Sequence, residues 1–119
     1  MPIKRSKQTP KARCWIEADG AYVMGDGRAR LLDAIDRTGS IARAARDLGI
    51  SYRHAWGFIR KLESRIGTKI VQTAKGGKGG GGCALLTQTG KTLLRKDLSF
   101  RKDVEKAILR TFAKHFGGG

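Results

Sequence analysis

The sequence predicts a mainly α-helical domain with a small β component, and three observations support this fold class. Residues 28–66 contain three short stretches in which apolar side chains recur at spacings of three and four, as along one face of an α-helix. A run of glycines and lysines at residues 75–82 is flanked by two short apolar or β-branched stretches, which predicts a β-hairpin. Residues 90–116 form one longer amphipathic stretch. A chain of 119 residues fits a single domain of this kind.

The N-terminal segment, residues 1–13, predicts a flexible basic arm. It holds five Lys or Arg residues, two prolines and no acidic residue, and no apolar stretch typical of a secretory signal follows it. After the arm, residues 14–24 place apolar and aromatic side chains on both sides of Asp19 and Gly20. An Asp-Gly dipeptide favours a tight turn, so we expect a short strand or hairpin there.

Three helices are predicted next, and local signals delimit them. They cover residues 28–37, 41–48 and 52–66. A glycine suited to the left-handed position after a helix follows each of them, and a serine able to cap a helix precedes the second and the third. These five residues are Gly39, Gly49, Gly67, Ser40 and Ser51.

The second and third helices carry the pattern of a helix-turn-helix. Small side chains at Ala44 and Ala45 allow two helices to cross closely. Gly49 permits a sharp turn between them, and Ile50 fills the angle. With the hairpin as a wing, the predicted architecture is a winged helix-turn-helix with a long C-terminal dimerisation helix. Its parts are a flexible basic arm (1–13), a winged helix-turn-helix domain (14–89), a dimerisation helix (90–116) and a frayed tail (117–119).

The long helix has an apolar stripe that needs a partner. Leucine, isoleucine, valine and phenylalanine recur in it at spacings near three and four, and charged residues of both signs fill the positions between them. We expect a second copy of the chain to cover this stripe, so that the protein is a homodimer. The residues predicted at the interface are Leu94, Leu98, Ile108, Leu109 and Phe112.

The charge of the chain predicts a polyanionic partner. Twenty-five Lys and Arg residues stand against ten Asp and Glu, which gives a net charge of +15 and a pI near 10.7. Such a chain repels itself at low salt unless a polyanion neutralises it. No stretch is apolar enough for a membrane span, and no helix combines a continuous apolar face with terminal aromatic anchors. Double-stranded DNA, rather than a membrane, is the expected partner, with a basic protein that lacks a polyanionic partner as the alternative.

In a helix-turn-helix bound to DNA, the start of the second helix lies in the major groove. Arg53 is the strongest candidate for base readout, because a guanidinium group matches the O6 and N7 acceptors of guanine. The competing interpretations are a phosphate contact or solvent exposure for Arg53, packing for Tyr52, and solvation for His54. The predicted DNA-binding residues are Ser51, Tyr52, Arg53, His54, Arg60 and Lys61 in the helix, Lys75 and Lys78 in the wing, and Lys4, Arg5 and Lys7 in the arm.

The wing and the arm have simpler interpretations as well. Glycines in the wing expose backbone N–H groups and its lysines supply charge, which suits a phosphate run or a minor groove; the alternative is a disordered loop. The arm either lies along the DNA backbone or is a solvated tail.

Two residues of the third helix carry separate expectations. Trp56 is expected in the core or at an interface rather than on DNA. Gly57 lies inside a predicted helix, where glycine costs about 1 kcal/mol relative to alanine, so we expect close approach there by another backbone or by DNA.

The sequence predicts no catalytic, metal or cofactor site. Gly90, Lys91 and Thr92 match the end of a P-loop, but Leu85 stands where that motif requires its first glycine. Cys14 and Cys83 form no CxxC pair and have no nearby histidine cluster, so free thiols in a reducing compartment are expected. A disulfide between them would require their two segments to meet in space.

Two motifs give the sequence a resemblance to a known family. TGSIARAARDLGISYRHAW and QTAKGGKGGGGCALLTQTGKTLL resemble the N-terminal DNA-binding domain of ModE-type molybdate-responsive regulators, which is similar to the winged helix of LysR-type regulators. The resemblance covers roughly residues 13–100. It implies a homodimer on a two-fold DNA site, with recognition helices in successive major grooves and the long helices paired. That role falls on Ser51, Tyr52 and Arg53, with Lys75 and Lys78 in the wings.

The sequence also departs from that family. ModE-type regulators carry separate C-terminal molybdate-binding modules, whereas this sequence stops after the long helix, so we expect neither molybdate binding nor another small-molecule effector. The expected function is a homodimeric transcriptional regulator, cytoplasmic and associated with the nucleoid. An architectural, chromatin-like protein with little sequence preference is the alternative, which the charge and the arm favour; an adaptor that binds protein through this fold is the third.

Overall fold

A computed structural model describes residues 7–75 and 82–117 of the chain. Within these ranges the chain forms four helices and two antiparallel two-stranded sheets, so the predicted class, mainly α with a small β component, is confirmed. Lys4, Arg5 and Lys78 lie outside the described residues. The elements are β1 (Ile16–Ala18), β2 (Ala21–Met24), α1 (Asp26–Thr38), α2 (Ile41–Leu48), α3 (Tyr52–Ile66), β3 (Val71–Ala74), β4 (Cys83–Leu86) and α4 (Gln88–Phe116).

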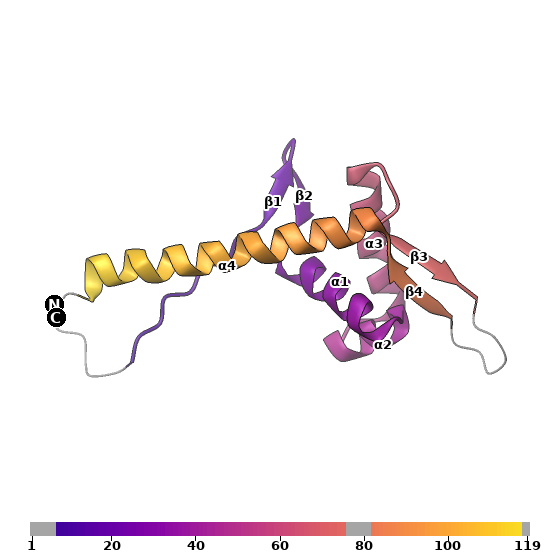
Figure 1. The fold of residues 1–119 in the computed structure, drawn as a ribbon, viewed down its shortest axis with the longest axis horizontal. Helices are drawn as coiled ribbons and strands as arrows, with labels where there is room; N and C mark the ends of the chain where they lie inside the picture. The colour runs from indigo at the N-terminus through magenta and orange to yellow at the C-terminus, as the bar shows by residue number, and fades with distance from the viewer. Residues whose placement is uncertain (1–6, 76–81, 118–119) are drawn as a thin grey trace.

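Helices α1, α2 and α3 form a compact body around an apolar core. The small side chains of Ala44, Ala45 and Ala55 are almost completely buried, which lets the helices approach one another closely. Larger core side chains come from all three helices, from β2, β3 and β4 and from the start of α4; they include Met24, Leu31, Leu32, Ile35, Ile59, Leu62, Ile70, Leu86 and Leu94. Hairpin β3–β4 lies at one end of the molecule, and α4 extends away from the body along its longest dimension (Figure 1).

The predicted turn signals form as expected at α2 and α3. The Ser40 hydroxyl accepts a hydrogen bond from the Arg43 N–H at 3.1 Å, and the Ser51 hydroxyl accepts one from the His54 N–H at 3.0 Å. Gly49 ends α2 with a φ of 70°, a left-handed conformation that favours glycine. These local signals therefore fix the angle at which α3 follows α2.

Helix α4 begins at Gln88, two residues before the predicted start at residue 90. Thr87 caps it: its hydroxyl accepts a hydrogen bond from the Gly90 N–H at 3.1 Å and donates one to the Lys69 carbonyl at 2.7 Å. Gly90 is buried against Ile70, the residue before β3, and a Cβ at this position would collide with the Ile70 carbonyl oxygen. The glycine of the GKT sequence is thus a packing residue at the junction of α4 and the body.

A buried ion pair connects α4 to the N-terminal segment. The Arg101 Nε donates to the Asp97 carboxylate at 2.7 Å, and the Arg101 Nη1 donates to the Cys14 carbonyl at 3.2 Å. The side chain of Asp97 is only 1% exposed, so this contact lies in the interior. Burial lowers the pKa of Arg101, but the hydrogen bond and the charge of Asp97 outweigh it and raise that pKa above its ordinary value. Arg101 therefore stays charged, and its hydrogen bond to the Cys14 carbonyl keeps the N-terminal segment against α4.

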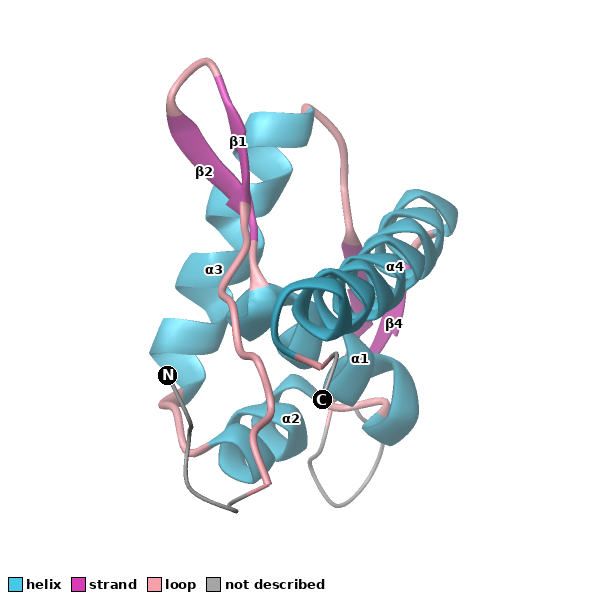
Figure 2. Cartoon of the chain, turned by 90° about the vertical axis from the view of Figure 1, so that its left-hand side faces the viewer, coloured by secondary structure: helices cyan, strands magenta, loops and turns pink. Residues whose placement is uncertain are grey.

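Another arginine anchors the N-terminal hairpin. Arg28 is buried in α1, donates to the Val23 carbonyl at 2.6 Å, and has its guanidinium 4.5 Å from the centre of the Tyr22 ring. The Phe58 ring of α3 lies on the same guanidinium, at 5.9 Å. Hairpin β1–β2 is thereby fixed beside α3, as Figure 2 shows.

Candidate nucleic-acid interface

The N-terminal edge of α3 is exposed to solvent, as DNA binding requires. Ser51, Arg53 and His54 are exposed, and Tyr52 is 54% exposed. The opposite face of the helix is buried in the core through Ala55, Ile59 and Leu62. The fold thus leaves all four of these residues, at the start of α3, open to solvent.

Further along α3, an aromatic side chain orients a basic one. The Tyr52 and Trp56 rings meet edge to face with their centres 6.4 Å apart, and the Arg60 guanidinium lies 5.6 Å from the centre of the Trp56 ring. Trp56 is half-buried against the core, in agreement with its predicted place. Arg60 and Lys61 are both exposed, and of these two residues Arg60 is the one with a described contact to an aromatic ring.

His54 points to a different side of α3 from Tyr52. Its ring centre lies 4.7 Å from that of Phe58, which in turn packs beside Arg28 near the N-terminal hairpin. At about 100° per residue, His54 lies well around the helix from Tyr52 and Trp56. His54 is therefore at the margin of the candidate interface.

The wing and α3 share a hollow of about 380 Å³ with the start of α2. Tyr52 and Trp56 line it from α3, and Lys75 lines it from the end of β3. The structure thus brings Lys75 to the same surface as the start of α3. Ser40 and Thr73 also line the hollow, and sequence analysis missed them as interface residues because no local pattern connects positions so far apart in the chain.

The described part of the basic arm lies elsewhere. Residues 7–13 run beside the C-terminal half of α4, away from hairpin β3–β4 (Figure 1). Pro10 lines an apolar hollow of about 420 Å³ together with side chains of α4 from Val104 to Phe116. Lys7, in this segment, is exposed. The described residues of the arm, 7–13, therefore lie on α4 rather than beside the β3–β4 wing.

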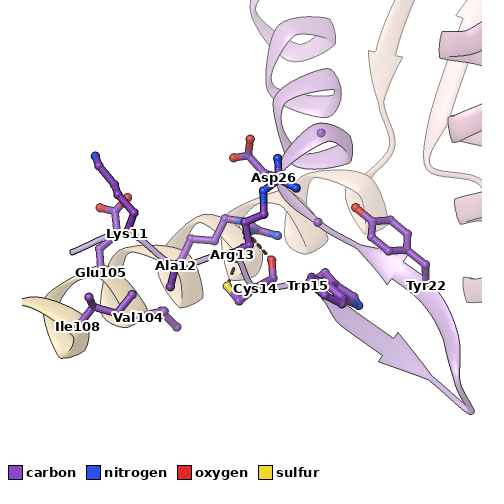
Figure 3. Close-up of a pocket in the computed structure, with 13 residues that line it drawn as sticks. Lys11, Ala12, Arg13, Cys14, Trp15, Tyr22, Asp26, Val104, Glu105 and Ile108 are labelled. Carbon is purple, nitrogen blue, oxygen red and sulfur yellow. Dashed lines mark hydrogen bonds between the residues drawn. The ribbon is translucent and has the colours of Figure 1, made fainter. Parts of the chain in front are cut away.

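A larger hollow, of about 680 Å³, lies between the N-terminal segment and α4 (Figure 3). Lys11, Arg13, Asp26 and Glu105 give it charges of both signs, and Trp15 lies at its edge. Among the described residues, no group of three or more His, Cys, Asp or Glu side chains could hold a metal ion. Cys14 and Cys83 are both free thiols. The residues that line the hollow of Figure 3 include no group of side chains typical of a catalytic site.

The structure divides the predicted dimer residues into three groups. Leu94 is 5% exposed and belongs to the core of its own chain, so it is not available to a partner; the amphipathic pattern could not separate it from the rest of the stripe. Leu98 and Leu109 are 45% and 53% exposed. Ile108 and Phe112 are partly covered and line the same hollow as Pro10.

In the part of the chain that the structure describes, no helix is long and apolar enough to cross a bilayer.

Comparison with known proteins finds relatives among bacterial regulatory proteins. A family model described as "Bacterial regulatory helix-turn-helix protein, lysR family" matches residues 27–91. The chain is 41% identical over 99 residues to the molybdenum-pterin-binding protein MopB of Rhodobacter capsulatus, which covers 83% of this chain and 36% of that protein. It is 44% identical over 68 residues to the DNA-binding transcriptional dual regulator ModE of Escherichia coli K12, which covers 57% of this chain and 26% of that protein.

These matches confirm the resemblance inferred from the two motifs. The chain spans about a third of the length of MopB and about a quarter of the length of ModE. Among solved structures, the CbnR_DBD–DNA complex is similar with a TM-score of 0.60 and 20% identity, over 76% of this chain and 98% of that one. At this identity the likeness shows the winged helix-turn-helix fold alone.

Proposed function

Because this chain belongs to the lysR family of bacterial regulatory helix-turn-helix proteins, we propose that it binds double-stranded DNA as a homodimeric transcriptional regulator. Helix α3 would enter the major groove, and the β3–β4 wing would contact the phosphate backbone or the minor groove. The function is recognition rather than catalysis. A protein of this kind would be located at the nucleoid.

One observation carries the proposal: the outer face of α3 is basic and open, while its inner face is fixed in the core. Arg53, Arg60 and Lys61 are exposed on a helix whose axis the caps and the packing of Ala55, Ile59 and Leu62 hold rigid. A rigid helix with such a face can place guanidinium groups at base edges with little loss of conformational entropy. Lys75, directly after the end of β3, extends the basic surface to the start of the wing loop.

Arg53→Ala tests the role of the α3 face. If Arg53 reads a guanine, the substitution should raise Kd for a preferred duplex by about 5- to 150-fold and relax one base position, as the loss of one bidentate contact would. The measurement is fluorescence anisotropy with a duplex selected by the wild-type protein and with scrambled duplexes. Arg43→Ala, an exposed arginine on α2, is the matched control. Equal weakening on all sequences would contradict base readout and would favour the alternative, a coating protein.

The proposal of a homodimer depends on the exposed apolar side chains of α4. Leu98 and Leu109 leave large apolar side chains in solvent on a helix that projects from the body, and such side chains favour burial by a partner. Paired α4 helices would present two α3 helices to one duplex, which suits the two-fold sites read by dimeric helix-turn-helix proteins.

Leu109→Glu should convert the dimer to a monomer, because burying an unpaired carboxylate in an apolar interface is unfavourable. Sedimentation velocity at micromolar concentration would measure the change. Arg110→Glu introduces the same carboxylate at the neighbouring exposed position and should leave the dimer intact. A wild-type protein that sediments as a monomer, on or off DNA, would rule out this part of the proposal.

A further inference from the structure

Gly57 occupies an unusual position on α3. At about 100° per residue, it lies opposite the buried stripe, in the same outer sector as Arg53, Arg60 and Lys61. A methyl group built at Gly57 would meet no atom of the described residues within 4 Å, apart from its own helix backbone and chain neighbours. The centre of the basic face of α3 is therefore bare backbone.

Nothing inside the described fold explains this glycine. Its conformation is helical, unlike those of Gly49 and Gly67, which have positive φ. Close packing is not the reason either, in contrast to Gly90, where a Cβ would strike the Ile70 carbonyl. Glycine inside a helix lowers the folding equilibrium constant about fivefold relative to alanine. The position thus lowers stability without a compensating contact in the chain itself.

We propose that Gly57 is the point of closest approach between α3 and DNA, and that its missing side chain lets α3 sit deeper in the major groove. This inference rests on the proposed function. A bare helix surface there removes the bulk that would hold the Arg53 guanidinium away from base edges, and it brings Arg60 and Lys61 nearer to the flanking phosphates. Gly57 is a positioning residue: it sets the depth at which its basic neighbours work.

The experiment is a size series at position 57, Gly57→Ala and Gly57→Leu, measured on a duplex selected by the wild-type protein. Gly57→Ala should raise Tm, because alanine favours the helix, and should at the same time raise Kd about fivefold or more. Gly57→Leu should raise Kd about a hundredfold, since a larger side chain displaces more of the contact. Binding to scrambled duplexes, which depends on phosphates, should change much less.

Gly27→Ala is the matched control. Gly27 is also helical and exposed, a methyl group there meets no described atom within 4 Å, and it lies on α1 beside the N-terminal segment rather than on the α3 face. This variant should leave Kd unchanged. Circular dichroism of each variant checks that the helices are formed, and Gly57→Ala, a helix-favouring change, keeps the test valid if Gly57→Leu fails to fold.

The outcomes distinguish the role of Gly57 from the proposed function as a whole. A higher Tm together with a higher Kd for the selected duplex in Gly57→Ala supports the inference. Unchanged specific binding in Gly57→Ala, together with weakened binding in Arg53→Ala, would overturn the role of Gly57 and leave the proposed function standing. A wild-type protein that binds no duplex would overturn both.

Discussion

Raising the salt concentration from about 50 mM to about 200 mM is expected to weaken binding to duplex DNA by about a thousandfold or more. The chain has a net charge of +15, and a dimer would neutralise several phosphates through the faces of α3 and the wings. Each neutralised phosphate releases condensed counterions, so the logarithm of affinity should fall linearly with the logarithm of salt concentration. Titrations at a series of KCl concentrations would give the slope.

Two variants refine this expectation. Lys75→Ala removes a charge at the start of the wing loop and should reduce the salt slope by about one for each protomer, on every sequence alike. Arg53→Ala should change sequence preference more than slope, if Arg53 contacts a base. A wild-type slope close to zero would show that phosphate contacts do not drive binding, and the charge argument would fail.

Arg101→Met is expected to lower the free energy of unfolding by about 3–5 kcal/mol, the usual effect of leaving a buried charge without its partner. The Asp97 side chain is 1% exposed, and its second oxygen, Oδ1, already lacks a hydrogen-bond partner among the described residues. The substitution also removes the hydrogen bond to the Cys14 carbonyl that holds the N-terminal segment on α4. Urea unfolding followed by circular dichroism would measure the loss.

Two further variants test whether burial of the Asp97–Arg101 pair causes the loss of stability. Replacing the whole pair, Asp97→Leu with Arg101→Met, should recover most of the stability, because no charge is then left buried. Arg37→Met breaks an exposed pair of the same spacing, in which the Arg37 Nε lies 3.1 Å from the Asp33 carboxylate, and should cost about 0.5 kcal/mol or less. Equal losses in Arg37→Met and Arg101→Met would mean that burial is not what makes the inner pair important.

Much of the fold follows from short-range sequence signals. Each serine cap and terminal glycine of α2 and α3 forms its hydrogen bond with a residue three or four positions away, so the chain specifies both ends of each helix without tertiary contacts. The same local pattern puts Tyr52 and Arg53 on the polar edge of α3, and the structure keeps them exposed. The start of α4 was predicted less well, because the Thr87 hydroxyl also bonds to the distant Lys69 carbonyl.

The sequence by itself determined the helix-turn-helix, the hairpins and the basic character of the chain, since periodicity, turn chemistry and charge are properties of neighbouring residues. Only the tertiary structure decided that Leu94 belongs to the core, that the arm runs beside α4, and that Arg101 joins Asp97 to Cys14. It also decided that Gly57 faces open space rather than a neighbouring backbone. These facts depend on which distant segments meet, and an amphipathic pattern states that a face is buried without stating what covers it.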